Sequence, residues 1–305
     1  MTRSRRTAPG VARRGRVRDR FSQGEQVRRE RGRLVGSPKA DLRRTLIERF
    51  LLRNLRGVPG PVLEIGPGTG RFTATLLEAR RPTVLLDLSH AMLRASRATR
   101  RRRDPGRLRQ LSFVQGAAER LPFEAGCFGA VTLVGVLGFL ARDGWDALRQ
   151  AARVLRPGGI LIVETQSAVQ AMGALFPEDP ATARRILRRP KEYYLDRIVE
   201  EGYQPHDPRR LANWEFRFWR PAEIQREVTA AGFRPVDRMA VGAGVGLHAG
   251  LLRAVHRDPT AWRNLVRTEE RVGRWEESLG GGATFLLAAQ RRAPDRSGSL
   301  VRSQR

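Results

Sequence analysis

The chain has 305 residues, of which 40% are hydrophobic, so it is long enough to bury one large core or one core with an inserted segment. Its net charge of +27 at pH 7 would indicate nucleic-acid binding if that charge were spread along one folded face. A single cysteine, Cys127, excludes an internal disulfide and a zinc site built from cysteines. We expect Cys127 to be a small apolar residue beside a strand, and we predict no metal site.

The positive charge is concentrated in three segments of the chain. Residues 1–36, 97–109 and 291–305 carry net charges of +9, +6 and +4. Nearly all basic residues are arginine, 56 against 2 lysines, which is typical of a coding bias as much as of a binding surface. Solvated tails and a nucleic-acid-binding role both remain compatible with this distribution.

The first 36 residues are rich in Arg, Gly and Ser, so they cannot bury enough apolar surface to offset the entropy of ordering. We expect residues 1–38 to form a disordered basic tail, with an arginine-rich mitochondrial presequence as the alternative. The sequence contains no uninterrupted apolar run of about 18 residues, which predicts no membrane span. No apolar run follows the N-terminal arginines either, so we expect no secretory signal and a cytoplasmic location.

Folding is expected to begin near Ser37-Pro38, because apolar residues recur at helical spacing from Asp41 onward. We expect this helix to lie over the mouth of a sheet. A first strand is predicted at 62–65, followed by a glycine-rich turn and a second helix. The next strand, 83–87, is a near-continuous apolar run that ends in an acid, as is typical of a buried parallel strand.

Strands and helices then alternate along the chain. Ser89 is well placed to cap a helix that ends near Asp104-Pro105-Gly106. Further strands are predicted at 111–115, 130–134 and 159–164, with an amphipathic helix at 145–155 before the last of these. This alternation predicts a parallel sheet with right-handed crossovers.

The C-terminal half departs from this alternation. Residues 168–213 contain no good strand and predict one or two helices, for example at 181–187 and 193–201, above the ligand end of the sheet. The remaining expected elements are a helix at 221–231, a strand at 235–241, a second insertion at 242–282, a last strand at 284–289 and a disordered tail at 293–305.

Three glycines mark the turn after the first strand. Gly66, Gly68 and Gly70 remove side chains from one side of the turn, so a ligand can approach the backbone and the N–H groups that open the next helix. The position, at the carboxyl end of a first strand, is typical of a nucleotide-like ligand. Arg71 stands where a dinucleotide fingerprint needs its third glycine, and no Gly-Lys-Ser/Thr of a Walker motif follows.

Four sequence blocks occur in order over about 100 residues. They are Glu64-Ile65-Gly66-Pro67-Gly68-Thr69-Gly70, Asp87-Leu88-Ser89 with Met92, Gly116-Ala117-Ala118-Glu119-Arg120-Leu121-Pro122-Phe123, and Arg153-Val154-Leu155-Arg156-Pro157-Gly158-Gly159. From residue 62 to 164 the chain resembles the class I S-adenosylmethionine-dependent methyltransferase family. Within it, the chain resembles the small-molecule branch that includes the ubiquinone and menaquinone biosynthesis methyltransferases.

The resemblance implies an α/β fold with a Rossmann-like, seven-stranded, mostly parallel sheet. Helices cover both faces, the last strand is antiparallel, and a helical insertion lies over the active site. The methyltransferase domain would span residues 39–292, with substrate-cap regions at about 168–213 and 242–282.

The resemblance also implies S-adenosyl-L-methionine as the cofactor. The backbone at the three glycines would approach its methionine and ribose portions, Glu64 would lie near the methionine ammonium, and Asp87 would accept both ribose hydroxyls. A carboxylate at a strand end is suited to that role, although Asp87 could instead only cap the next helix. The other expected cofactor contacts are Leu88, Ala117, Ala118, Glu119 and Val134, and residues 134–137 would line the methyl-donor site.

Ala117 departs from the family pattern, which usually has an aspartate that accepts the adenine amino group. An alanine side chain cannot accept that hydrogen bond. Either Glu119 or a main-chain carbonyl takes over, or cofactor affinity is reduced, or binding has been lost. Gly129 likewise replaces a common aspartate, and we expect that change to be structural.

Methyl transfer from a sulfonium is intrinsically downhill, so the protein chiefly aligns the reactants and excludes water. A dedicated base is needed only for a poor nucleophile. No catalytic residue is assigned; His206, His248 and Tyr203 are weak candidates, and the other residues considered are Tyr193, Tyr194, Asp207 and His256. For each of them the alternative is a surface or packing role, which is also what we expect of His90.

An aromatic cluster stands in the inserted region: Tyr203, Trp214, Phe216, Phe218 and Trp219. It could line a pocket for an apolar or aromatic substrate, or anchor the insertion to the core. Gly242, Gly244 and Gly246 lack a following acid-tipped strand and predict only a flexible loop.

The expected function is methyl transfer (EC 2.1.1 type) to an O, N or C atom of a small molecule. One alternative is an RNA methyltransferase that uses the basic tails, although no Asn- or Asp-Pro-Pro-Tyr motif occurs. The other is a non-catalytic, methyltransferase-like binding protein. Substrate identity and oligomeric state are not predicted.

Overall fold

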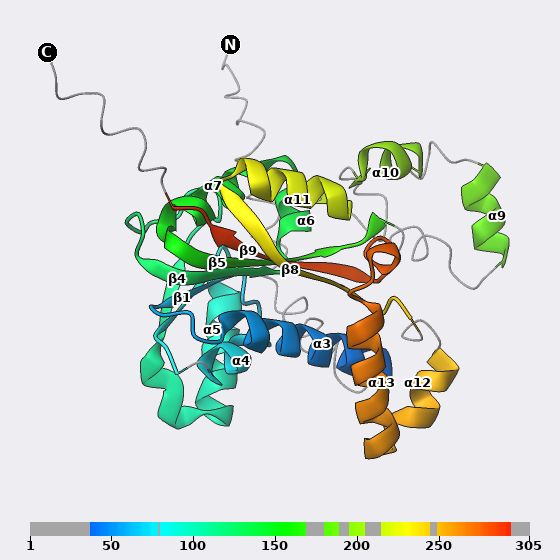
Figure 1. Cartoon of the computed structure of the whole chain (residues 1–305), viewed down its shortest axis with the longest axis horizontal. Helices are drawn as coiled ribbons and strands as arrows, with labels where there is room; N and C mark the ends of the chain where they lie inside the picture. Colours follow the sequence, from blue (N-terminus) through cyan, green and yellow to red (C-terminus); the bar gives the residue numbers. More distant parts are fainter. Residues whose placement is uncertain are drawn as a thin grey trace, which may run out of the picture.

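A computed structural model describes residues 37–78, 80–168, 180–188, 195–204, 215–244 and 249–293 (Figure 1). A seven-stranded sheet in the order β3-β2-β1-β4-β5-β9-β8 runs through the middle of the described chain. Its strands are β1 (Val62–Ile65), β2 (Thr83–Asp87), β3 (Leu111–Gln115), β4 (Phe128–Val134), β5 (Leu155–Gln166), β8 (Phe233–Val241) and β9 (Thr284–Arg291).

The pairing of the strands confirms the predicted α/β sheet. Strands β3, β2, β1, β4 and β5, neighbours in that order, pair in parallel, whereas β9 is antiparallel to both of its neighbours. The first three strands have the predicted bounds. β4 and β5 begin earlier than predicted, because Phe128 already pairs with Leu155 before the turn at 157–159.

Helices cover both faces of the sheet (Figure 1). One face carries α3 (Pro38–Leu55), α4 (Thr73–Glu78), α5 (His90–Arg103), α12 (Ala249–His256) and α13 (Pro259–Val272). The other carries α6 (Leu137–Leu140), α7 (Gly144–Val154) and α11 (Pro221–Ala230). Short 3-10 helices lie at η1 (Pro105–Gln110), η2 (Ala141–Asp143) and η5 (Glu276–Ser278).

Helix α3 packs along a face of the sheet, so its predicted place over the mouth is wrong. The Ser37 side chain caps it by accepting a hydrogen bond from the Ala40 N–H at 3.2 Å. Buried residues recur along the full length of the helix, and they pack against alternate residues of β4, β5, β8 and β9. A stripe of that length needs a sheet face to cover it, and only the first turns of α3 reach the carboxyl ends of the strands.

The first inserted region contains the two predicted helices, α9 (Pro180–Arg188) and α10 (Leu195–Glu201). A two-stranded ladder that the sequence did not predict pairs β6 (Tyr203–Gln204) of this region with β7 (Phe216–Arg217), just beyond it. Strands of two residues have no alternating pattern to detect. Among the described helices, none is both long and apolar enough to cross a membrane.

Candidate functional site

The turn after β1 has a left-handed backbone at all three of its glycines, with φ of +68°, +55° and +78°. A side chain at Gly66 would collide with Val136, and one at Gly70 would come within 2.5 Å of the Ser96 hydroxyl. At Gly68, by contrast, no atom of the described residues lies within 4 Å of where a β-carbon would stand. Gly68 is therefore the position at which the turn borders open space.

The backbone N–H groups of the turn are largely used within the protein. Gly66 donates to the Leu86 carbonyl at 2.7 Å, and the Gly68 N–H donates to the carboxylate of Asp87. These two glycines therefore contribute shape and close approach rather than free hydrogen-bond donors.

Glu64 lies on β1 and is only 4% exposed. Its Oε2 accepts a hydrogen bond from the Thr73 hydroxyl at 2.7 Å. Burial raises the pKa of Glu64 to about 7, although the Thr73 hydrogen bond and the positive charge of Arg100 oppose the rise. The sequence did not single out Thr73 or the buried Arg100 as neighbours of this carboxyl group.

Asp87 ends β2 beside the glycine turn and is half-buried. Its Oδ1 accepts the Ser89 N–H at 2.8 Å. Burial raises the pKa of Asp87 to about 6, although the hydrogen bonds from Ser89 and Gly68 lower it. The cap of α5 is the Ser89 side chain, which accepts the Met92 N–H. Asp87 is therefore not the residue that caps this helix.

Residues 116–119 lie at the end of the site beyond Asp87. The Gly116 N–H donates to the Asp87 carbonyl at 3.1 Å, which ties this segment to β2. The Ala117 carbonyl accepts the Arg120 N–H at 3.2 Å, so this main-chain acceptor is already used once. Ala118 is buried and Glu119 is half-buried.

Gln115 is a polar residue at the same end that the sequence interpretation missed. It pairs in register with Asp87, and its Nε2 donates to the Leu88 carbonyl at 3.2 Å. Its position as the polar last residue of a predicted strand was the signal that could have identified it.

The loop after β4 lies along the other side of the glycine turn. Leu133 pairs with Ile65 of β1, and Val136 contacts the position of Gly66. Val134 and Val136 are half-buried, whereas Leu137 is fully buried in the core under α7. Residues 134–136 therefore lie beside the turn, whereas Leu137 points into the core and its predicted lining role stays a prediction.

The described residues among the weak catalytic candidates are held by carboxylates. The Tyr203 hydroxyl donates to Glu215 Oε1 at 2.5 Å. His256 Nε2 lies 3.1 Å from Asp41 Oδ2 on α3. Neither contact involves a residue of the glycine turn or Asp87. The remaining candidates, His206, His248, Tyr193, Tyr194 and Asp207, lie outside the described residues.

Three residues of the aromatic cluster, Phe216, Phe218 and Trp219, are buried, and Tyr203 is half-buried. Trp219 is fully buried and packs edge-on against Trp145, with ring centroids 5.1 Å apart. Phe216 packs between Phe139 and Phe218. These contacts favour the anchoring interpretation over a substrate wall, and Trp214 lies outside the described residues.

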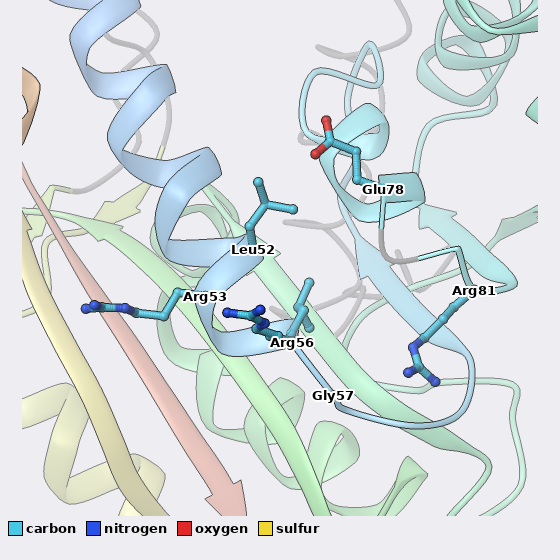
Figure 2. A pocket seen from close by; sticks show the side chains of 7 residues that line it. Leu52, Arg53, Arg56, Gly57, Glu78 and Arg81 are labelled. Carbon is cyan, nitrogen blue, oxygen red and sulfur yellow. The ribbon is translucent and has the colours of Figure 1, made fainter. Parts of the chain in front are cut away.

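A separate pocket of about 460 Å³ lies at the other end of α3 and α4 (Figure 2). Its lining residues are Leu52, Arg53, Leu55, Arg56, Gly57, Glu78 and Arg81. Helix α4 begins at the glycine turn and ends at this pocket. The pocket contains none of the predicted cofactor residues.

Comparison with known proteins identifies the central part of the chain. Residues 63–163 match the family described as "Methyltransferase domain". The demethylmenaquinone methyltransferase of Mycobacterium marinum is 33% identical over 211 residues, which cover 64% of this chain and 78% of that protein. The ubiquinone/menaquinone biosynthesis C-methyltransferase UbiE of Idiomarina loihiensis is 38% identical over 115 residues, or 36% of this chain and 44% of the relative.

The chain spans less than half the length of the UbiE relatives that it matches. Among solved structures, the putative methyltransferase in complex with the Trm112 activator of Haloferax volcanii aligns with a TM-score of 0.55 at 19% identity. That alignment covers 91% of this chain and 98% of the other. The [4+2]-cyclase SpnF aligns with a TM-score of 0.51 at 17% identity over 81% of both chains. These two likenesses show the fold alone.

The sheet order, the glycine turn and the acid-tipped β2 together define a Rossmann-like fold with a nucleotide-type ligand site. With the sequence relatives, they show that the chain belongs to the class I S-adenosylmethionine-dependent methyltransferase family. Within that family it is similar to the ubiquinone and menaquinone biosynthesis methyltransferases, as its four sequence blocks indicated. The cofactor of the family is S-adenosyl-L-methionine.

Proposed function

We propose that this protein transfers a methyl group from S-adenosyl-L-methionine to an O, N or C atom of a small molecule. The observation that carries the proposal is the open space at Gly68, directly beside the half-buried carboxylate of Asp87. The two hydroxyls of a ribose can donate to such a carboxylate. The absence of a side chain at Gly68 leaves room for the part of the cofactor next to the ribose.

In this proposal Glu64 faces the methionine ammonium and Asp87 accepts the ribose hydroxyls. Glu119 takes the adenine amino group in place of the Ala117 side chain, because the Ala117 carbonyl already accepts the Arg120 N–H. The remaining contacts are Gly66, Gly68, Gly70, Leu88, Ala118 and Val134. All of these residues come from the carboxyl ends of neighbouring strands and the turns that follow.

The cofactor supplies a methyl group already activated as a sulfonium. The chain's own contribution is to align an acceptor beside residues 134–136 and to exclude water. Tyr203 is disfavoured as a base, because its hydroxyl already donates to Glu215. His206 and His248 stay weak candidates.

The substrate class that the relatives support is a quinone-type aromatic molecule. The Mycobacterium marinum relative, which aligns over 211 residues, bears the name demethylmenaquinone methyltransferase, and reduced demethylmenaquinone is therefore the first acceptor to test. We further propose that residues 39–292 form the methyltransferase domain between two basic tails, and that the protein works in the cytoplasm.

RNA is less suited as the methyl acceptor. The described basic segment 97–109 begins in the second half of α5, and α5 starts next to Asp87 and runs for 14 residues. At 1.5 Å per residue, the arginines at its end lie about 20 Å from the cofactor site. RNA held there would not present its bases to the methyl donor.

Calorimetric titration with S-adenosyl-L-methionine tests the proposal. We expect one site per chain, and we expect Asp87→Ala to weaken binding by more than tenfold while the variant stays folded by circular dichroism. No heat from folded wild-type protein would leave only the non-catalytic, methyltransferase-like interpretation. Unchanged affinity in Asp87→Ala would contradict the role given to Asp87.

A further inference from the structure

Besides Glu64 and Asp87, another carboxyl group lies buried near the site and has no proposed contact with the cofactor. Glu164, near the end of β5, is completely buried. Its Oε1 accepts a hydrogen bond from Arg43 Nη2 of α3 at 2.6 Å. Its Oε2 is also buried and has no hydrogen-bond partner among the described residues.

An unsatisfied carboxylate oxygen is costly in a protein interior. The Arg43 pair compensates the charge of Glu164 but leaves the second oxygen without a donor. An ion pair that only tied α3 to the sheet would not require that free oxygen. The arrangement is better explained if a donor from a ligand completes it.

The free oxygen faces the loop that borders the glycine turn. Glu164 pairs in register with Val134 of β4, and Oε2 lies 3.7 Å from where a β-carbon of Gly135 would stand. Gly135 itself is exposed, and the next residue, Val136, contacts the position of Gly66. The oxygen therefore lies beside the loop along which the acceptor is proposed to sit.

Two more buried polar atoms without described partners share this face of the sheet. Thr132 pairs in register with Glu64 and Ile162, and its hydroxyl is buried and unpaired among the described residues. Thr284 of β9 has the same property and alternates with residues that pack under α3. Three buried polar side chains, Glu164, Thr132 and Thr284, thus lie on the sheet face that α3 covers.

We propose that Glu164 is an acceptor-binding residue, whose Oε2 accepts a hydrogen bond from an O–H or N–H group of the molecule to be methylated. This inference rests on the proposed function. A carboxylate only accepts hydrogen bonds, so the site selects an acceptor that carries a donor next to the methylated atom. The ring hydroxyls of reduced demethylmenaquinone satisfy that condition.

The test is equilibrium binding of reduced demethylmenaquinone to the full chain, without oxygen and with saturating S-adenosyl-L-homocysteine. Glu164→Gln keeps the size of the side chain and its contact with Arg43 but loses the charged acceptor. We expect its dissociation constant for the quinol to rise at least tenfold, while the constant for S-adenosyl-L-homocysteine stays within twofold.

Glu270→Gln is the matched control, because Glu270 also binds an arginine of α3, Arg49, at 2.9 Å. It should weaken the attachment of α3 without changing quinol binding. If Glu164→Gln does not fold, the double variant Arg43→Gln/Glu164→Gln is used in its place, because it removes both charges of the buried pair together.

Wild-type affinity for the quinol in the Glu164 variant would overturn the inference and leave the proposed function standing. An equal loss in Glu270→Gln would also overturn it, because the effect would then come from the seating of α3. If wild-type protein binds the cofactor but not the quinol, the proposed acceptor class fails and the inference fails with it.

Discussion

Gly68 differs from the other two glycines of its turn because its missing side chain borders open space rather than a neighbour. Gly68→Ala should therefore lower cofactor affinity at least tenfold by filling that space. The left-handed backbone should cost on the order of 1 kcal/mol of stability. Calorimetry and chemical unfolding measure the two effects.

Gly57→Ala is the control for this substitution. Gly57 also has a positive φ, +73°, and no described atom within 4 Å of a β-carbon, but it lies at the far end of α3. It should lose similar stability and keep full cofactor affinity. Equal losses of affinity in both variants would show that backbone strain, rather than the filled space, weakens binding.

Asp87 predicts a pH dependence of cofactor binding. Burial raises its pKa to about 6, and the ionised form is the better acceptor for two ribose hydroxyls. Affinity should therefore fall as the pH drops through 6, by at most about tenfold per pH unit. Titrations between pH 5 and 8 would measure this, and a variant Asp87→Asn should bind weakly with a flatter profile. An identical slope in that variant would assign the dependence to another group.

Glu64 predicts a pH dependence of stability in the cofactor-free protein. Its pKa is about 7 when folded and near 4.5 when unfolded, so protonated Glu64 contributes stability below pH 4.5 that is lost as the pH rises through 7. Glu64→Gln cannot ionise, so relative to wild type it should gain roughly 3 kcal/mol between pH 4.5 and 8. Urea unfolding at the two pH values measures the difference. A difference that does not change with pH would contradict the burial of a titrating carboxyl group here.

At the scale of elements, helix α3 connects the sheet to the site through its first turns. Ser37 caps it, and Arg43 reaches Glu164 from the second turn. Ser37→Ala should cost about 1 kcal/mol of stability, whereas Ser37→Gly should cost only a few tenths. Thermal or urea unfolding distinguishes the two. Equal, negligible effects would mean that α3 is held by its packing alone.

The elements also show how far the sequence could predict this structure. The short runs that end in Ile65 and Asp87 placed β1 and β2 to the residue, because buried parallel strands are mostly apolar along their length. Helical spacing identified the buried side of α3 but not the surface that covers it, so its place over the mouth was wrong. Periodicity shows which face of a helix is buried, but it does not show which element that face packs against.

The candidate site was predictable where its residues lie in short motifs. Asp87 and the glycine turn come together through the parallel register of β1 and β2, which follows from the order of strands. The contact between Arg43 and Glu164 joins residues 121 positions apart, and it depends on how α3 crosses the sheet. No local pattern encodes that crossing.

Among the residues that the structure describes, two groups of arginines lie away from the cofactor site. Arg101, Arg102 and Arg103 are exposed at the last turn of α5, whereas Arg100 is buried against Asp104. The arginine-lined pocket of Figure 2 also lies away from the glycine turn. These arginines are suited to attract anions without taking part in methyl transfer.

Replacing Arg101, Arg102 and Arg103 with glutamine should therefore weaken binding to single-stranded RNA and leave methyl transfer unchanged. Three lost phosphate contacts should reduce the slope of log affinity against log salt by about 2. Filter binding across salt concentrations measures the slope. A parallel loss of methyl transfer would favour RNA as the substrate.

Methyl transfer to a small aromatic acceptor can be followed directly by mass. The full chain is incubated with S-adenosyl-L-methionine carrying a labelled methyl group and with reduced demethylmenaquinone, and the products are separated by mass. We expect labelled quinone to form in step with S-adenosyl-L-homocysteine, and both products to be lost in Gly68→Ala but not in Gly57→Ala. Cofactor binding with no label in the quinone would contradict the proposed acceptor, and label in co-incubated RNA instead would establish the alternative.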